Sequence, residues 1–268
     1  MAAIDRLLQI MERLRDPERG CPWDRQQTFG SIVPHTLEEA YEVADAIEQE
    51  DWAALPDELG DLLFQVVFYA QLGREEGSFD FDTIAAAVSD KLVRRHPHVF
   101  GDETVADAAD QSRRWEAHKA AERAAGPSAD AASALDGVTG ALPAVQRAGK
   151  LQGRAERAGF EWPRDEDLFA KVDEELGELR AEVDQQAPQT RLEHEVGDLL
   201  FAAVGLARRL GVDPEAALRA SNRRFERRFR HMEQRLDERG QAMARAELDE
   251  LKAHWQAAKR ATDGDPET

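Results

Sequence analysis

The chain has 268 residues, of which 33% are charged and 42% hydrophobic, a composition typical of a folded globular protein rather than a disordered one. Its net charge of −19 argues against binding to nucleic acid polymers, because their phosphates require a basic surface. No apolar run approaches the roughly 18 residues that a membrane span needs.

The first fifteen residues carry charges throughout and predict an amphipathic helix rather than a secretion signal. Cys21 is the single cysteine, so the sequence offers no disulfide framework. We therefore expect a cytoplasmic protein.

Helical signals follow one another along the chain, and no segment alternates convincingly as a β-strand. Thr36, three residues before Glu39, predicts a capping box at a helix start. Apolar residues recur at helical spacing over residues 57–73 and predict a core helix. Pro56 and Pro214 lie where first helical turns are expected. Glycine marks three predicted helix ends, Gly77, Gly159 and Gly211.

The sequence contains an internal repeat. ELGDLLF at 58–64 recurs as EVGDLLF at 195–201, and EEAYE at 38–42 recurs as EELGE at 174–178. Basic and tryptophan positions recur in the same order, separated by about 133 to 140 residues. The expected fold is all-α, with two tandem copies of a bundle of four or five helices. We place the N-terminal domain at 1–125, a linker at 126–134 and the C-terminal domain at 135–268.

Four acidic residues accompany the central helices of each copy. A spacing of three residues puts both carboxylates of a pair on one helical face, beside an apolar stripe, so that the acids converge between helices. Repulsion of about 4 kcal/mol for a pair at about 4 Å is relieved by a hard cation with oxygen ligands. Mg²⁺ fits best, with Mn²⁺ as a possible substitute. The candidate metal ligands are Glu39, Glu42, Glu58 and Asp61 in the first copy, and Glu175, Glu178, Glu195 and Asp198 in the second.

A di-iron carboxylate bundle also collects acids between helices, but it requires Glu-x-x-His motifs. His35 lies four residues before Glu39, and His194 directly precedes Glu195, so neither histidine provides that motif. A redox metal is therefore disfavoured.

Together with CPWDRQQT at 21–28 and RRHPHVFGD at 94–102, these motifs resemble the MazG family of nucleoside triphosphate pyrophosphohydrolases over essentially the whole chain. The resemblance implies a homodimer that binds magnesium through the four acids and splits nucleoside triphosphates between the α and β phosphates. It also implies broad base tolerance and a role in clearing surplus or abnormal nucleotides. The metal would activate a water for attack on the α-phosphorus. Glu38 and Glu174, which precede the metal-binding pairs, are candidates to accept its proton.

Basic and aromatic residues shared by the copies are candidates for binding the rest of the nucleotide. Arginine pairs with phosphate oxygens and tryptophan stacks on bases, although arginines also cover apolar surface and tryptophans also fill cores. The candidates are Lys91, Arg94, Arg95, Trp115 and Lys119 in the first copy, and Arg224, Arg227, Arg228, Trp255 and Lys259 in the second.

The copies differ in their cations. In the second copy, Lys171 and Arg191 lie one helical turn before an acid of each pair, where a cation can bind phosphate. The equivalent residues of the first copy are His35 and Ala54. We therefore expect the second copy to be the main catalyst.

Other classes of protein stay open. A non-catalytic sensor of nucleotide and magnesium would bind triphosphate without releasing pyrophosphate, and a structural scaffold would not need eight acids in register. Within the enzyme class, narrower hydrolysis of dUTP or phosphoribosyl-ATP uses related bundles.

Overall fold

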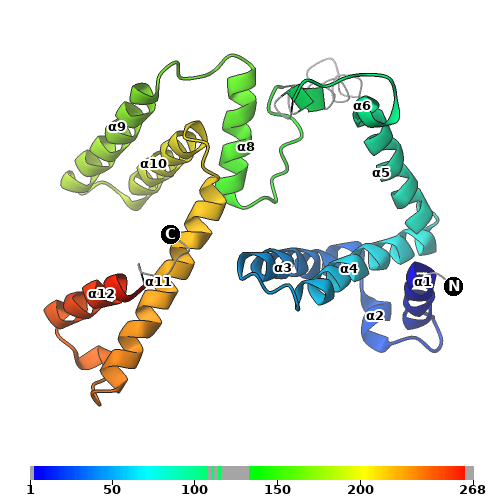
Figure 1. Cartoon of the computed structure of the whole chain (residues 1–268), viewed down its shortest axis with the longest axis horizontal. Helices are drawn as coiled ribbons and strands as arrows, with labels where there is room; N and C mark the ends of the chain where they lie inside the picture. Colours follow the sequence, from blue (N-terminus) through cyan, green and yellow to red (C-terminus); the bar gives the residue numbers. More distant parts are fainter. Residues whose placement is uncertain (1–2, 108–109, 112–113, 116–132, 263–268) are drawn as a thin grey trace. The chain divides into compact units, whose positions relative to one another are not determined.

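The computed structural model describes residues 3–107, 110–111, 114–115 and 133–262. These residues form eleven α-helices and one short 3₁₀-helix, with no β-strand among them (Figure 1). The expectation of an all-α fold is confirmed. The chain divides into two compact units, Met1–Gly126 and Pro127–Thr268. The predicted linker falls mostly outside the described residues. None of the described helices has the length and apolar character needed to cross a bilayer.

The first unit is built on a helical hairpin. Its helices are α1 (Ala3–Leu14), α2 (Pro22–Gln26), α3 (Phe29–Glu48), α4 (Leu55–Glu76), α5 (Phe81–Arg95) and α6 (Pro97–Phe100). Helices α3 and α4 pack along one another, and α1 lies against α4. Their contact buries a core cluster of Met11, Ile32, Val67, Phe68 and Leu72.

The predicted helix start at Thr36 is wrong. Helix α3 begins at Phe29, and Thr28 is its N-cap in a capping box with Ser31. Thr36 lies inside the helix, where its hydroxyl donates to the carbonyl oxygen of Ile32 at 3.2 Å. The segment holds two capping signals, and the upstream one prevails because the longer helix buries Ile32, which is 1% exposed.

The second unit repeats this hairpin. Its helices are α8 (Ala144–Arg157), α9 (Asp165–Asp184), α10 (Gln189–Arg209), α11 (Pro214–Asp237) and α12 (Leu248–Thr262), with a 3₁₀ turn at Met243–Arg245. Helices α9 and α10 correspond to α3 and α4, and α8 packs on α10 and α11. Helix α12 folds back on α11.

The proline and glycine signals match the observed boundaries. Pro56 and Pro214 lie in the first turns of α4 and α11. The predicted helix ends Gly77, Gly159 and Gly211 have positive φ angles of 69°, 95° and 71°. That left-handed backbone conformation stops a helix and is open to glycine at little cost.

Candidate metal-binding active site

The four acids of the second copy converge between α9 and α10. Oxygens of Glu175, Glu178 and Glu195 lie within 4.8 Å of one another. Glu195 and Asp198 form a second such group with His194. Glu175 and Glu195 are only 5% and 6% exposed. Carboxylates so close and so buried need a positive charge beside them, which a divalent cation or a basic side chain can provide.

Basic side chains supply part of that charge. The Lys171 amino group lies 2.7 Å from a carboxylate oxygen of Glu175 and 3.0 Å from one of Glu174. These bonds, chiefly the one to Glu175, raise the pKa of Lys171 above its ordinary value. Arg191 pairs closely with Glu182 and lies 3.8 Å from Glu195. The structure therefore brings both predicted cations to the acids.

The first copy assembles similar acids with less positive charge. Oxygens of Glu39, Glu58 and Asp61 lie within 4.8 Å of one another. Burial, followed by a hydrogen bond with Glu42, raises the pKa of Glu39. Burial and the charges of Glu42 and Asp61 raise the pKa of Glu58. Burial is the larger cause of both raised pKa values and the neighbouring carboxylates add to it, and a bound cation would oppose both effects.

The first copy has different residues at the positions equivalent to Lys171 and Arg191. His35 lies 3.6 Å from Glu38, with which it can form an ion pair when protonated. The amide nitrogen of Gln65 donates to Glu39 at 3.3 Å. Neutral hydrogen bonding thus replaces the lysine contact made by the equivalent glutamate of the second copy.

A family model for the MazG nucleotide pyrophosphohydrolase domain matches the chain twice, over residues 27–100 and 164–233. This chain belongs to the MazG family. The two matched segments contain α3 and α4 in the first copy and α9 and α10 in the second, so each includes a complete set of acids.

Two similar proteins match nearly the whole chain, and a third matches about half of it. This chain is 52% identical over 261 residues to the nucleoside triphosphate pyrophosphohydrolase of Escherichia coli K12, and the match covers 97% of this chain and 98% of the relative. It is 40% identical over 255 residues to the nucleoside triphosphate pyrophosphohydrolase/pyrophosphatase MazG of Thermotoga maritima, covering 95% of each. A Mycobacterium tuberculosis nucleoside triphosphate pyrophosphohydrolase is 36% identical over 153 residues, or 56% of this chain and 44% of the relative.

One histidine beside the acids of the second copy was not predicted as a possible metal ligand. The His194 ring nitrogen lies 3.4 Å from an oxygen of Asp198 and 3.9 Å from one of Glu195. The Glu-x-x-His pattern does not detect this histidine, because His194 precedes both acids in the chain. Its spacing of four residues from Asp198 places both on one face of α10 and is the signal that could have found it.

The other predicted nucleotide contacts lie on helices that do not carry the acids. The Arg228 guanidinium lies 5.9 Å from the centre of the Trp255 ring, and Phe225 packs at 5.4 Å from the same ring. In the first copy, Arg95 lies 5.0 Å from the Trp115 ring. Both tryptophans thus have a packing role, and their stacking on a base stays a prediction. Lys91, Arg94 and Arg95 lie on α5, Arg224, Arg227 and Arg228 on α11, and Trp255 and Lys259 on α12. Lys119 is outside the described residues.

Proposed function

We propose that this MazG protein hydrolyses nucleoside triphosphates to the monophosphate and pyrophosphate with Mg²⁺, mainly in its second copy. The observation that carries the proposal is the cluster of four acids on α9 and α10, with Lys171 and Arg191 one helical turn before two of them. The relatives named as nucleoside triphosphate pyrophosphohydrolases support the choice of substrate.

Glu175, Glu178, Glu195 and Asp198 would hold the magnesium. Their hard, clustered oxygens suit that ion, and Mn²⁺ accepts the same ligands. Magnesium supplies positive charge against the triphosphate and activates water as a nucleophile. The equivalent acids of the first copy, Glu39, Glu42, Glu58 and Asp61, would bind the ion without the two cations and contribute little turnover.

Lys171 and Arg191 have two successive partners in this proposal. Without metal they neutralise Glu175, Glu182 and Glu195. When a divalent ion neutralises the cluster, the two side chains become available to phosphate oxygens within reach of the same helices. Glu174, which is bonded to Lys171 and largely exposed, is then freed to accept a proton from water. Glu38 would have that role in the first copy.

A homodimer is part of the proposal and is supported by a repeated exposed stripe. Val196 and Leu200 on α10 are 43% and 60% exposed, and their counterparts Leu59 and Leu63 on α4 are 47% and 40% exposed. Apolar residues left exposed at the same positions of both copies suggest a surface that a second chain covers. A Leu200→Glu variant that sediments as the wild type would argue against this interface.

The experiment that tests the proposed function is a panel of nucleoside triphosphates incubated with Mg²⁺, with identification of the products. Monophosphate and pyrophosphate from several bases would support a broad pyrophosphohydrolase. Turnover of a single base would favour a narrower enzyme. Binding of triphosphate without release of pyrophosphate would favour a regulatory sensor and contradict the proposal.

A further inference from the structure

The two copies differ in the chemistry of the side chains that gather at their acids. In the second copy a ring nitrogen of His194 joins carboxylate oxygens of Glu195 and Asp198, and these atoms lie within 4.8 Å of one another. The aligned motifs ELGDLLF and EVGDLLF match His194 with Asp57 of the first copy. The group in the first copy contains carboxylates alone, from Glu39, Glu58 and Asp61. Nitrogen is therefore offered to a metal in the second group and not in the first.

The spacing of the His194 ring suits a ligand of a shared ion. Its Nδ1 atom lies 3.4 Å from an oxygen of Asp198 and 3.9 Å from one of Glu195. Both separations exceed the roughly 2.7–3.2 Å of ordinary hydrogen bonds to nitrogen. Ligands about 2.1 Å from an octahedral ion lie about 3 Å from their neighbours. The His194 side chain is 72% exposed, so it has room for the small movement that would bring its nitrogen to that spacing.

The buried carboxylate of this group lacks a close partner. Glu195 is 6% exposed, and no hydrogen bond reaches its carboxylate from the part of the chain that the structure describes. Its contacts with basic groups are long, 3.8 Å to Arg191 and 3.9 Å to His194. A buried carboxylate normally has a close counter-charge or a metal. Glu195 is therefore an independent indication that a cation binds beside His194.

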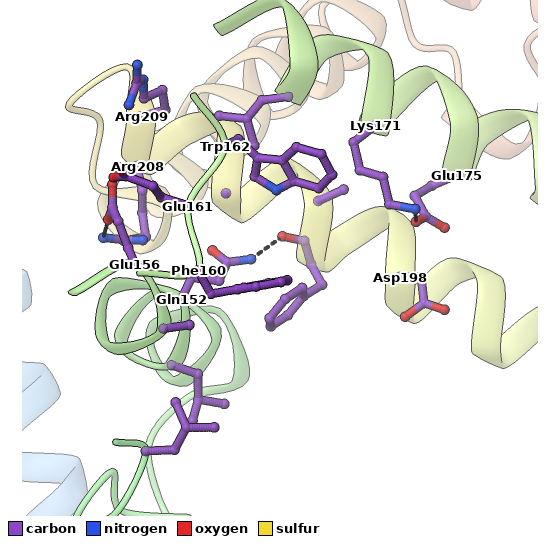
Figure 2. A pocket seen from close by; sticks show the side chains of 17 residues that line it. Gln152, Glu156, Phe160, Glu161, Trp162, Lys171, Glu175, Asp198, Arg208 and Arg209 are labelled. Atoms are coloured by element: carbon purple, nitrogen blue, oxygen red, sulfur yellow. Dashed lines mark hydrogen bonds and ion pairs between the residues drawn. The ribbon is translucent and has the colours of Figure 1, made fainter. Parts of the chain in front are cut away.

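The lysine of the second copy neutralises a different part of the cluster. Lys171 lies 2.7 Å from Glu175 on α9, and Figure 2 shows this pair, with Asp198 projecting from α10. Among the described residues, His194 is the one basic side chain within 4.0 Å of an Asp198 oxygen. The carboxylates of α10 thus depend on His194 and on a bound ion rather than on the lysine.

We propose that His194 is a nitrogen ligand of the metal bound by Glu195 and Asp198, and that it shifts the preference of the second copy towards ions that accept imidazole. The inference rests on the proposed function, because these acids are among those that would hold magnesium. Imidazole suits Co²⁺, Ni²⁺ and Zn²⁺, whereas Mg²⁺ prefers oxygen ligands and water. Mg²⁺ would bind through the carboxylates with the histidine unbound. The first copy, with Asp57 at this position, would keep the preference of an oxygen site.

Pulsed electron paramagnetic resonance of the full chain saturated with Mn²⁺ tests the ligand directly, because it detects nitrogen bonded to the ion. The wild type is expected to show a histidine nitrogen coupling that changes when its histidines are labelled with nitrogen-15. This comparison needs no substitution. His194→Asn, which is neutral and exposed, is expected to lose the coupling. His35→Asn is the matched control, because His35 lies beside the acids of the first copy, and it should keep the coupling.

Isothermal titration with Mg²⁺ and with Co²⁺ measures the preference. To confine the signal to the second copy, the full chain carries Glu39→Gln and Asp61→Asn in the first. Adding His194→Asn to this protein is expected to lower the ratio of the Mg²⁺ Kd to the Co²⁺ Kd about tenfold. Equal weakening of both ions would leave the ratio unchanged.

Three results would overturn the inference. They are a wild type without a histidine nitrogen coupling, a coupling that survives in His194→Asn or disappears in His35→Asn, and an unchanged ratio of the two Kd values. Failure of the proposed function is read separately, from the absence of pyrophosphate when the wild type is given ATP and Mg²⁺, since the metal measurements contain no nucleotide.

Discussion

Lys171 and Glu175 form an ion pair of 2.7 Å, one helical turn apart on α9. Glu175 is 5% exposed, so its charge has little access to solvent and depends on a nearby cation. In the protein without metal, Lys171 is that cation. If a metal ion binds these acids as proposed, it would compete with Lys171 for the Glu175 carboxylate, and the released amino group would be available to a phosphate.

Lys171→Met removes this charge while keeping the length of the side chain. We expect Mg²⁺ to bind more tightly, because it no longer displaces a lysine, while kcat falls by about tenfold or more through loss of a phosphate contact. Isothermal titration with Mg²⁺ and steady-state kinetics measure the two effects. His35→Met, at the equivalent position of the first copy, serves as the control and should leave kcat unchanged. A parallel fall in magnesium affinity and kcat would show that Lys171 merely supports the fold.

Removing one negative charge from the acids of either copy tests which copy is the main catalyst. Glu175→Gln and Asp198→Asn are expected to lower kcat by about 100-fold or more, because metal placement supports every step. Glu39→Gln and Asp61→Asn should leave most of the activity. Pyrophosphate release by the four variants, at matched protein concentration, measures the effect. Equal losses from both sets would mean that both copies work or that they are coupled.

Arg191→Ala imitates Ala54 of the first copy. Arg191 lies on α10, where it pairs with Glu182 and lies 3.8 Å from Glu195. We expect KM for nucleotide to rise or kcat to fall by about tenfold, while Mg²⁺ still binds. Arg180→Ala, an exposed arginine on α9, is the control. Loss of magnesium binding in Arg191→Ala would contradict a role towards phosphate.

Low pH should lower the stability of the first unit, because it protonates Glu75. Arg15 donates to its two carboxylate oxygens at 2.8 and 2.6 Å, and this interaction holds the pKa of Glu75 below its ordinary value of 4.5 despite the opposing effect of burial. A lowered pKa in the folded state gives a stabilisation that is complete above pH 4.5 and is lost as the pH falls below it. Glu75→Gln should cost about 1 kcal/mol in free energy of unfolding at neutral pH.

The cost of Glu75→Gln should shrink as the pH drops below 4.5, as judged by urea unfolding at several pH values. Glu76→Gln, a neighbouring exposed residue, should show no such dependence. A loss of unfolding free energy that stays constant across this pH range would show that the ion pair between Arg15 and Glu75 does not stabilise the first unit.

The helices and the acid clusters followed from residue spacing. Acids three residues apart must share a helical face, and helical hairpins then bring two such faces together, so the convergence of Glu175 and Glu195 is predictable from the sequence. The start of α3 is not predictable from the sequence in this way, because Thr28 and Thr36 can both cap a helix and the choice depends on the burial of Ile32. Residue spacing also does not predict the cavity of about 460 Å³ that α8, α9 and α10 line in the second unit. Its presence depends on how side chains from three separate helices pack together.

The site of bond cleavage tests the central claim most directly. ATP is hydrolysed by the wild type with Mg²⁺ in water enriched in oxygen-18, and the products are analysed by mass spectrometry. Attack on the α-phosphorus predicts the label in AMP, unlabelled pyrophosphate and no turnover in excess chelator. Label in orthophosphate with ADP as the second product, or undiminished turnover in chelator, would contradict the account.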